Sequence, residues 1–278
     1  MKVFLMTDME GVSGVLNYDD WCYAGSRHYE QGRRLLTEET NSVVAGMLEG
    51  GATSVLVVDG HGQGGIDPET LHPDADLLRG PVPGPYPFNV EGSDVIAWVG
   101  QHAKAGTEHA HLPHTQGFNV IDLAVNGESI GELGQMAFCA AMFGVAPIFA
   151  AGDRALTLEA QRLLPGIQTV AVKTGVNCGG SEHLSTDEYR RAFAGARHRS
   201  RRAVLQDLRQ GAAQALTRFR AKPDSFYRWQ APDRFRRTLK LRHASGRPEV
   251  LESEYPDLLS LMNDLTPISA GLVERNQP

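Results

Sequence analysis

Residues 1–14 of the chain read MKVFLMTDMEGVSG. The apolar run Val3–Thr7 has the length and composition of a short buried strand. Two carboxylates, Asp8 and Glu10, follow this run directly, and Gly11 comes next. In open α/β sheets ligands bind beyond the carboxyl ends of the strands, so acidic residues at this position are candidates for a binding site.

This strand is the first in a series that alternates with helices. Helical apolar spacing covers Tyr29–Leu48, and Gly50-Gly51 ends that helix. The other predicted elements are strands over Ser54–Val58, Asp94–Val99, Val120–Val125, Ala146–Ala151 and Thr169–Lys173, and helices over Leu133–Phe143 and Ala155–Leu164. Short apolar strands alternating with helices predict an α/β fold with a mostly parallel sheet and helices on both faces.

The pattern is weaker in the last third of the chain. Ser185–Arg220 starts with a helix-capping sequence and continues as a long Arg-rich helix or helix pair. Strands are expected near Arg236–Leu241 and Pro248–Glu252, and the four-proline segment 80–93 is expected to be an irregular loop at a pocket rim. We therefore expect a catalytic α/β core over residues 1–200. A smaller C-terminal α+β portion over 201–278 would serve oligomerisation or the substrate rim, or belong to the same domain.

Composition and charge argue against several classes of protein. The 278 residues include 27 Lys and Arg against 33 Asp and Glu, and a formal charge of −6 argues against a nucleic-acid partner. Three cysteines without a CxxC pair indicate reduced thiols and a cytoplasmic location. The uncharged stretch Met136–Gly152 is interrupted by Gly144 and Pro147, so we expect a buried helix and a buried strand, not a membrane span.

Metal-ligating side chains follow several of the predicted strands. These candidates are Asp8, Glu10, His61, His102 and Glu132. Mixed carboxylate and imidazole ligands suit zinc, manganese or another divalent ion, often as a pair. One carboxylate shared by two ions would leave two further ligands for each. Taken singly, such residues are more often a helix cap, a surface acid, or a turn or core histidine, so the prediction depends on their convergence at one sheet edge.

Three further residues are candidates for supporting roles. His114 lies on an irregular segment and could transfer a proton near neutral pH. Asp59 could orient a ligand imidazole or the backbone from the second coordination shell. Asp153 could line the pocket or cap the following helix. His109 and His111 are expected to be exposed loop histidines.

The sequence lacks the common nucleophile and phosphate-binding motifs. It contains no G-x-S-x-G elbow, no P-loop and no strand-placed G-x-G-x-x-G. From the residues alone, three readings remain open besides a two-metal peptidase. They are a two-metal phosphoesterase, another metal-dependent amidohydrolase, and a non-catalytic metal-binding protein.

An ordered set of short segments covers roughly the first two thirds of the chain. The segments are 7–14 (TDMEGVSG), 32–41 (GRRLLTEETN), 59–61 (DGH), 71–76 (LHPDAD), 100–103 (GQHA), 131–134 (GELG) and 151–153 (AGD). Together they resemble the zinc D-aminopeptidase family of bacterial dipeptide-transport operons. The resemblance implies two zinc ions per subunit, bridged by Asp8. Glu10 and His61 would bind one ion, and His102 and Glu132 would bind the other.

The same resemblance implies an activity and an assembly. His114 matches the catalytic histidine of the family. The implied reaction is removal of the N-terminal residue from short peptides, with a preference for D-residues such as D-Ala. The implied assembly is a ring-like homo-oligomer, a decamer stacked from pentamers, whose active sites face an internal chamber.

Overall fold

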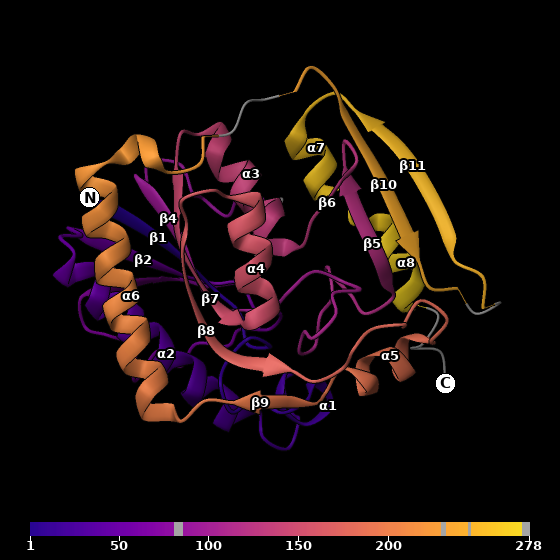
Figure 1. Cartoon of the computed structure of the whole chain (residues 1–278), viewed down its shortest axis with the longest axis horizontal. Coiled ribbons are helices and arrows are strands. Elements are labelled where there is room, and N and C mark those ends of the chain that lie inside the picture. The colour runs from indigo at the N-terminus through magenta and orange to yellow at the C-terminus, as the bar shows by residue number, and fades with distance from the viewer. Residues whose placement is uncertain (81–85, 229–231, 244–245, 274–278) are drawn as a thin grey trace.

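A seven-stranded sheet runs through the middle of the molecule in the order β3-β2-β1-β4-β7-β8-β9 (Figure 1). The computed structural model describes residues 1–80, 86–228, 232–243 and 246–273, with side chains up to residue 269. All neighbouring strands of this sheet are parallel except β8 and β9. The strands are β1 (Lys2–Thr7), β2 (Ser54–Asp59), β3 (Ala75–Leu78), β4 (Val95–Gln101), β7 (Ala146–Asp153), β8 (Gln168–Gly175) and β9 (Ala196–His198).

Helices cover both faces of this sheet. Successive residues of β1 point to opposite faces, so Val3 and Leu5 belong to one buried cluster and Phe4 and Met6 to the other. The first cluster includes residues of α2 (Tyr29–Glu49) and α6 (Arg201–Ala221). The second includes residues of α3 (Glu132–Met142) and α4 (Arg154–Leu163). The predicted fold class is therefore confirmed, and Figure 1 shows the two helix layers on either side of the sheet.

A second, antiparallel sheet lies beside the α3 and α4 layer, in the order β11-β10-β5-β6. Its strands are β5 (Val120–Val125), β6 (Glu128–Ser129), β10 (Phe235–Leu241) and β11 (Glu249–Tyr255). Residues 120–125 form a strand as predicted, but this strand pairs with β10 and β6 and not with the parallel sheet. The pairing with β6 is local, because Asn126 and Gly127 both have positive φ angles and form a two-residue turn that reverses the chain. The pairing with β10 joins segments far apart in the sequence.

The C-terminal half follows one of the two arrangements that the sequence leaves open. The sequence predicts one long helix or a helix pair over Ser185–Arg220, and this segment forms the pair α5 (Thr186–Ala192) and α6, with β9 between them. Ser185 caps α5 through a reciprocal pair of hydrogen bonds with Glu188. The remaining helices are α1 (Tyr18–Trp21), α7 (Leu258–Asn263), α8 (Thr266–Val273) and a 3-10 turn over Pro223–Ser225.

The proline-rich segment and the long uncharged stretch are each described at least in part by the structure. Residues 86–93 form turns as expected, whereas residues 81–85 of the same proline-rich segment lie outside the described residues. The uncharged stretch Met136–Gly152 is divided between α3 and β7. Across the described ranges, no helix is both long and apolar enough to cross a bilayer.

A buried ion pair joins α2 to α6. Arg201 Nη1 lies 2.7 Å from Glu39 Oε1, and the backbone N–H of Ser13 donates to the same oxygen at 2.9 Å. Burial raises the pKa of Glu39 from 4.5 to about 7, against the opposing effect of the Arg201 charge. The folded state therefore binds this proton more tightly than the unfolded chain does.

This shift predicts a pH-dependent effect of Glu39→Gln. The contribution of Glu39 to stability falls as the pH rises from 4.5 to about 7, whereas a glutamine does not titrate. The free energy of unfolding of the variant, minus that of the wild type, should increase across this window by up to roughly 3 kcal/mol. Urea unfolding at several pH values measures this difference.

A matched control is Glu38→Gln, because Glu38 pairs with the same arginine but its side chain is 55% exposed. The control should give a difference that is nearly flat with pH. A flat or falling difference for Glu39→Gln would contradict the burial-driven shift.

Candidate metal centre

A cavity of about 560 Å³ opens at the carboxyl ends of β1, β2 and β4. One part of its lining is charged and polar and includes Asp8, Glu10, His61, Gln101, His114 and Glu132. Another part is apolar and includes Met6, Phe88, Trp98, Met136 and Leu265. The cavity therefore combines a cluster of ligating groups with a surface on which an apolar group can pack.

The first group of possible ligands is Asp8, Glu10 and His61, whose ligating atoms all lie within 4.8 Å of one another. His61 Nδ1 is 2.9 Å from Asp8 Oδ1 and 3.1 Å from Glu10 Oε2. The other ring nitrogen, Nε2, is 2.6 Å from the carbonyl oxygen of Cys22. A neutral His61 therefore donates its N–H to that carbonyl and presents the Nδ1 lone pair to the two carboxylates.

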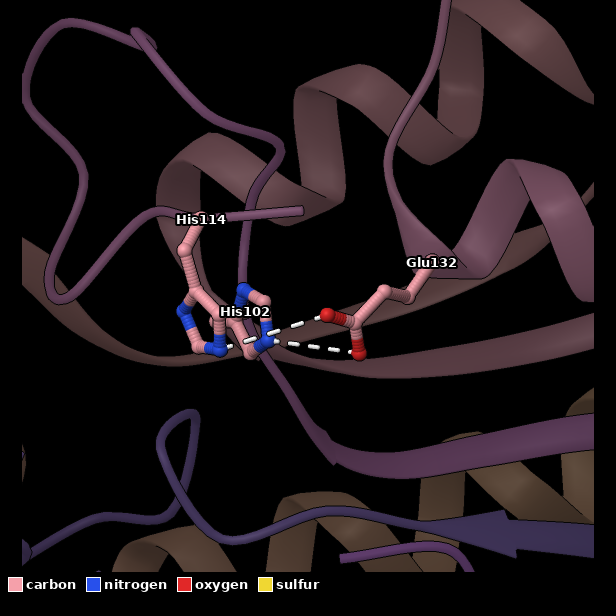
Figure 2. A group of neighbouring side chains, drawn as sticks. All are labelled: His102, His114 and Glu132. Carbon is pink, nitrogen blue, oxygen red and sulfur yellow. Dashed lines mark ion pairs between the residues drawn. The ribbon is translucent and has the colours of Figure 1, made fainter. Parts of the chain in front are cut away.

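The second group is His102, His114 and Glu132, shown in Figure 2. His102 Nε2 is 3.6 Å from Glu132 Oε2, and His114 Nε2 is 3.9 Å from Glu132 Oε1. The Nδ1 atoms of the two histidines lie 3.0 and 2.8 Å from the carbonyl oxygens of Ala103 and Leu112. In their neutral forms, both rings thus present an Nε2 lone pair toward Glu132, and they stack with their centroids 3.8 Å apart.

Asp8 lies between the two groups. Its Oδ1 contacts His61, whereas its Oδ2 is 3.2 Å from His102 Nε2. Gln101 Nε2 also donates to Oδ2 at 3.0 Å, and the backbone N–H of Met9 donates to Oδ1 at 2.8 Å. Each oxygen of one fixed carboxylate therefore points at a different group.

Two glycines allow the ends of β1 and β4 to cross at close range. The N–H of Gly11 donates to the carbonyl of Gly100 at 2.7 Å. A Cβ atom on Gly11 would lie 2.0 Å from the carbonyl oxygen of Gln101, and one on Gly100 would lie 1.9 Å from that of Asp8. Gly100 also has a φ of +73°, which L-residues with a side chain rarely adopt. This crossing brings the ligands that follow β1 next to those that follow β4.

The electrostatics of the cluster are those of a cation site. Burial alone would raise the pKa of Asp8, but hydrogen bonds and charges from His102 and His61 hold it well below its ordinary value. Burial alone would lower the pKa of His61 and of His102, but neighbouring carboxylates, with Glu10 strongest for His61 and Glu132 for His102, hold both well above the ordinary value. In the absence of a metal cation, the surrounding carboxylates favour the protonated forms of His61 and His102.

Two buried ligating atoms also lack hydrogen-bond partners. Among the described residues, Glu10 Oε2 and His102 Nε2 are buried with no partner of hydrogen-bond geometry, although each contacts an oppositely charged group. Unpaired buried polar atoms are costly, and a divalent cation would satisfy both. The nitrogen and carboxylate donors therefore fit zinc or a similar ion.

Asp59 acts on the backbone and not on the imidazole of His61. Its two carboxylate oxygens accept the N–H groups of Gly65 and Ile66 at 2.7 and 3.1 Å. Arg79 Nε lies 3.6 Å from Oδ2. Asp59 thus fixes the loop that follows His61, and it also lines the cavity.

Asp153 is the N-cap of α4, where its Oδ1 accepts the N–H of Leu156 at 3.1 Å. Its Oδ2 accepts the N–H of His111 at 3.0 Å. The expectation of an exposed His111 is wrong, because its ring is fully buried and Nε2 lies 3.0 Å from the carbonyl oxygen of Leu16. The segment that carries His111 is folded between the β1 loop and α4, whereas His109 is exposed as expected.

Sequence reasoning missed two buried charges that contact the ligand-bearing segments. Lys173, in β8, donates to the backbone carbonyls of Glu10 and Val12. Glu159, in α4, accepts the N–H groups of Lys104 and Gly131. Their positions in the sequence could have identified them. Lys173 is the last residue of a predicted buried strand, and Glu159 lies on the buried face of an amphipathic helix.

Comparisons with known proteins give a consistent result. A D-aminopeptidase of Bacillus subtilis (strain 168) is 37% identical over 191 residues, which are 66% of this chain and 68% of that protein. The solved structure described as the Zn-dependent D-aminopeptidase DppA from Bacillus subtilis, a self-compartmentalizing protease, superposes with a TM-score of 0.81. It is 28% identical, and the match covers 100% of both chains.

A peptidase family model described as D-aminopeptidase matches residues 1–247. The matched region contains the parallel sheet, all residues of the two candidate ligand groups, and most of the second sheet. The chain therefore belongs to the D-aminopeptidase family.

Proposed function

We propose that the chain is a dinuclear zinc aminopeptidase that removes the N-terminal residue of short peptides and prefers D-residues such as D-Ala. The observation that carries this proposal is Asp8, whose two oxygens point to separate groups. In this proposal Asp8 would be a ligand of both ions. Glu10 and His61 would complete the ligands of one ion, and His102 and Glu132 would complete those of the other. The Zn-dependent relative supports the choice of metal.

The cavity accounts for how a peptide would be held. Bound zinc supplies Lewis acidity, which activates water and polarises a carbonyl group. The apolar lining of the cavity offers Trp98 and Met136 as packing surfaces for a substrate side chain. Tyr86 also lines the cavity, and its hydroxyl accepts a hydrogen bond from Gln116 Nε2 at 2.9 Å, so its own proton is available to the substrate.

His114 is suited to proton transfer at Nε2. Burial and the neighbouring His102 charge lower its pKa, so its imidazole is neutral near pH 7 and can accept a proton. Its Nδ1–H is fixed on the carbonyl of Leu112. The ring is held between His102 and Phe118, with centroids at 3.8 and 4.4 Å. In the proposed reaction Nε2 takes a proton from the nucleophile and delivers it to the leaving amine.

Assembly and location are part of the same proposal. The self-compartmentalizing relative supports an oligomeric assembly. We propose that this assembly is a ring-like decamer and that the C-terminal portion over 201–278 contributes to subunit contacts or to the substrate rim. Leu265 lines the cavity and brings this portion to the rim. The free thiols of Cys22, Cys139 and Cys178 support a cytoplasmic location. Light scattering of the purified chain tests the assembly.

The first prediction from the proposed function concerns metal content. The chain should bind two zinc ions per subunit, and the affinity should fall as the pH is lowered from about 8 to about 6. The reason is that neighbouring carboxylates hold the pKa values of His61 and His102 well above the ordinary 6.5, so protons compete with the metal before the pH falls to that value. Equilibrium dialysis with metal analysis measures both quantities. A single ion per subunit, or an affinity independent of pH, would contradict the proposed ligand set.

The second prediction concerns the reaction. D-Ala p-nitroanilide should be cleaved faster than the L-Ala compound, and p-nitrophenyl phosphate should not be cleaved. Asp8→Asn should abolish cleavage, because a neutral amide has one acceptor oxygen and cannot offer a negatively charged oxygen to each of two cations. Release of p-nitrophenol without anilide cleavage would favour a phosphoesterase. Zinc binding without turnover on any of these substrates would favour a non-catalytic role.

The third prediction separates proton transfer by His114 from metal binding. His114→Ala should keep both zinc ions and lose roughly 10²- to 10⁴-fold in kcat. His109→Ala is the matched control, since His109 is exposed in the neighbouring loop, and it should leave kcat unchanged. If His114→Ala lost one zinc ion, the residue would be a ligand, as its place in the second group allows. If His114→Ala retained full activity, His114 would not transfer a proton in the reaction.

A further inference from the structure

We propose that Lys173 and Glu159 are positioning residues, each of which sets the geometry of one half of the metal centre. Lys173 would set the half formed by Glu10 and His61. Glu159 would set the half formed by His102 and Glu132. This inference rests on the proposed two-zinc function and extends it to two residues outside the ligand set.

Lys173 is a buried cation whose hydrogen bonds go to the backbone of the β1 loop. Its side chain, at 1% exposure, extends from β8, and Nζ donates to the carbonyl oxygens of Glu10 at 2.5 Å and Val12 at 2.8 Å. Among the described residues, no carboxylate forms an ion pair with this ammonium. Burying an ammonium group is expensive, so its presence here calls for a local role that an apolar side chain could not perform.

The two carbonyls lie on either side of Gly11. One ammonium group therefore holds the peptide groups that follow Glu10 and Val12. The first of these peptide planes adjoins the Cα atom of Glu10 and restricts the direction in which its side chain leaves the backbone. The Glu10 carboxylate is itself buried, and its Oε2 lies 3.1 Å from His61 Nδ1. Loss of the ammonium would leave the Glu10 carbonyl without its donor and the Val12 carbonyl with only the N–H of Val15, at 3.4 Å, which would loosen the loop.

Glu159 performs the corresponding task for the second half. It is 6% exposed, and its Oε2 accepts the N–H of Lys104 at 2.8 Å while its Oε1 accepts that of Gly131 at 3.0 Å. Lys104 is two residues after His102, and Gly131 immediately precedes Glu132 at the start of α3. One carboxylate therefore ties together two ligand-bearing segments that arrive from different sheets.

The fit around Gly131 is close. A Cβ atom on this glycine would lie 2.9 Å from Glu159 Oε1. The Glu159 carboxylate faces the backbone and does not line the cavity. It sets the 3.6 Å separation between His102 Nε2 and Glu132 Oε2 by holding the two segments that carry these side chains. A glutamine at position 159 can accept from only one of the two N–H groups with its oxygen, and its amide nitrogen would oppose the other.

The contacts of the two residues do not overlap, so their effects should be separable. Lys173 contacts the β1 loop, and Glu159 contacts the segments after β4 and before α3. A residue that only stabilises the fold would weaken both halves together. A positioning residue should weaken one half and leave the other unchanged.

The experiment combines each substitution with the loss of a ligand and counts zinc ions at a fixed free-zinc concentration. Lys173→Met should reduce zinc affinity about 10- to 100-fold in the first half only. In the His61→Ala background it should therefore leave the one remaining ion bound, whereas in the His102→Ala background it should leave none. Glu159→Gln should give the reverse pattern in the same two backgrounds.

Matched controls are Lys240→Met and Glu128→Gln, which change a partly exposed lysine and an exposed glutamate, and both should retain two ions. Circular dichroism checks the fold. If Lys173→Met does not fold, Lys173→Gln, which keeps one donor group, should show the same pattern with a smaller loss.

The inference is overturned if Lys173→Met binds both ions with wild-type affinity, or if the two substitutions weaken both halves equally. It stands if the zinc pattern holds even when the wild-type chain cleaves no peptide, an outcome that would reject the peptidase proposal alone. A wild-type chain that binds a single ion would reject both.

Discussion

Buried negative charge at the carboxyl ends of the parallel strands is the constraint on which the site depends. Asp8 lies 7% exposed between two histidines, with a separate partner for each carboxylate oxygen. Such a cluster is unfavourable without cations, and the histidines of the isolated chain are driven to hold protons in their place. Metal binding would remove this repulsion, which links the stability of the cluster to its proposed chemistry.

The rest of the fold supplies the precision that this cluster needs. The crossing of β1 and β4 is possible because glycine occupies both Gly11 and Gly100. Other buried charges contact the backbone of the ligand-bearing loops instead of the ligands themselves, as Asp59 and Lys173 do. The candidate ligands are therefore held in part by hydrogen bonds that fix the main chain of the loops that carry them.

The strand-end rule predicted part of the site from sequence because parallel strands end at one edge of the sheet. It brought Asp8, Glu10 and His61 together correctly. It also selected Glu132, but on the wrong assumption that the preceding strand β5 belongs to the parallel sheet. This strand belongs to the antiparallel sheet, where its pairing with β10 joins residues more than a hundred positions apart. Strands β3 and β9 were too short for a periodic signal, and no local pattern encodes the contacts of Glu159 with two distant backbone segments.

The central claim is that Asp8 holds two cations at once. A crystal structure of the zinc-loaded protein, with anomalous diffraction recorded above and below the zinc absorption edge, tests it most directly. Two anomalous peaks roughly 3.5–4 Å apart, one beside each oxygen of Asp8, are the predicted result. A single peak, or a peak that no oxygen of Asp8 contacts, would contradict it.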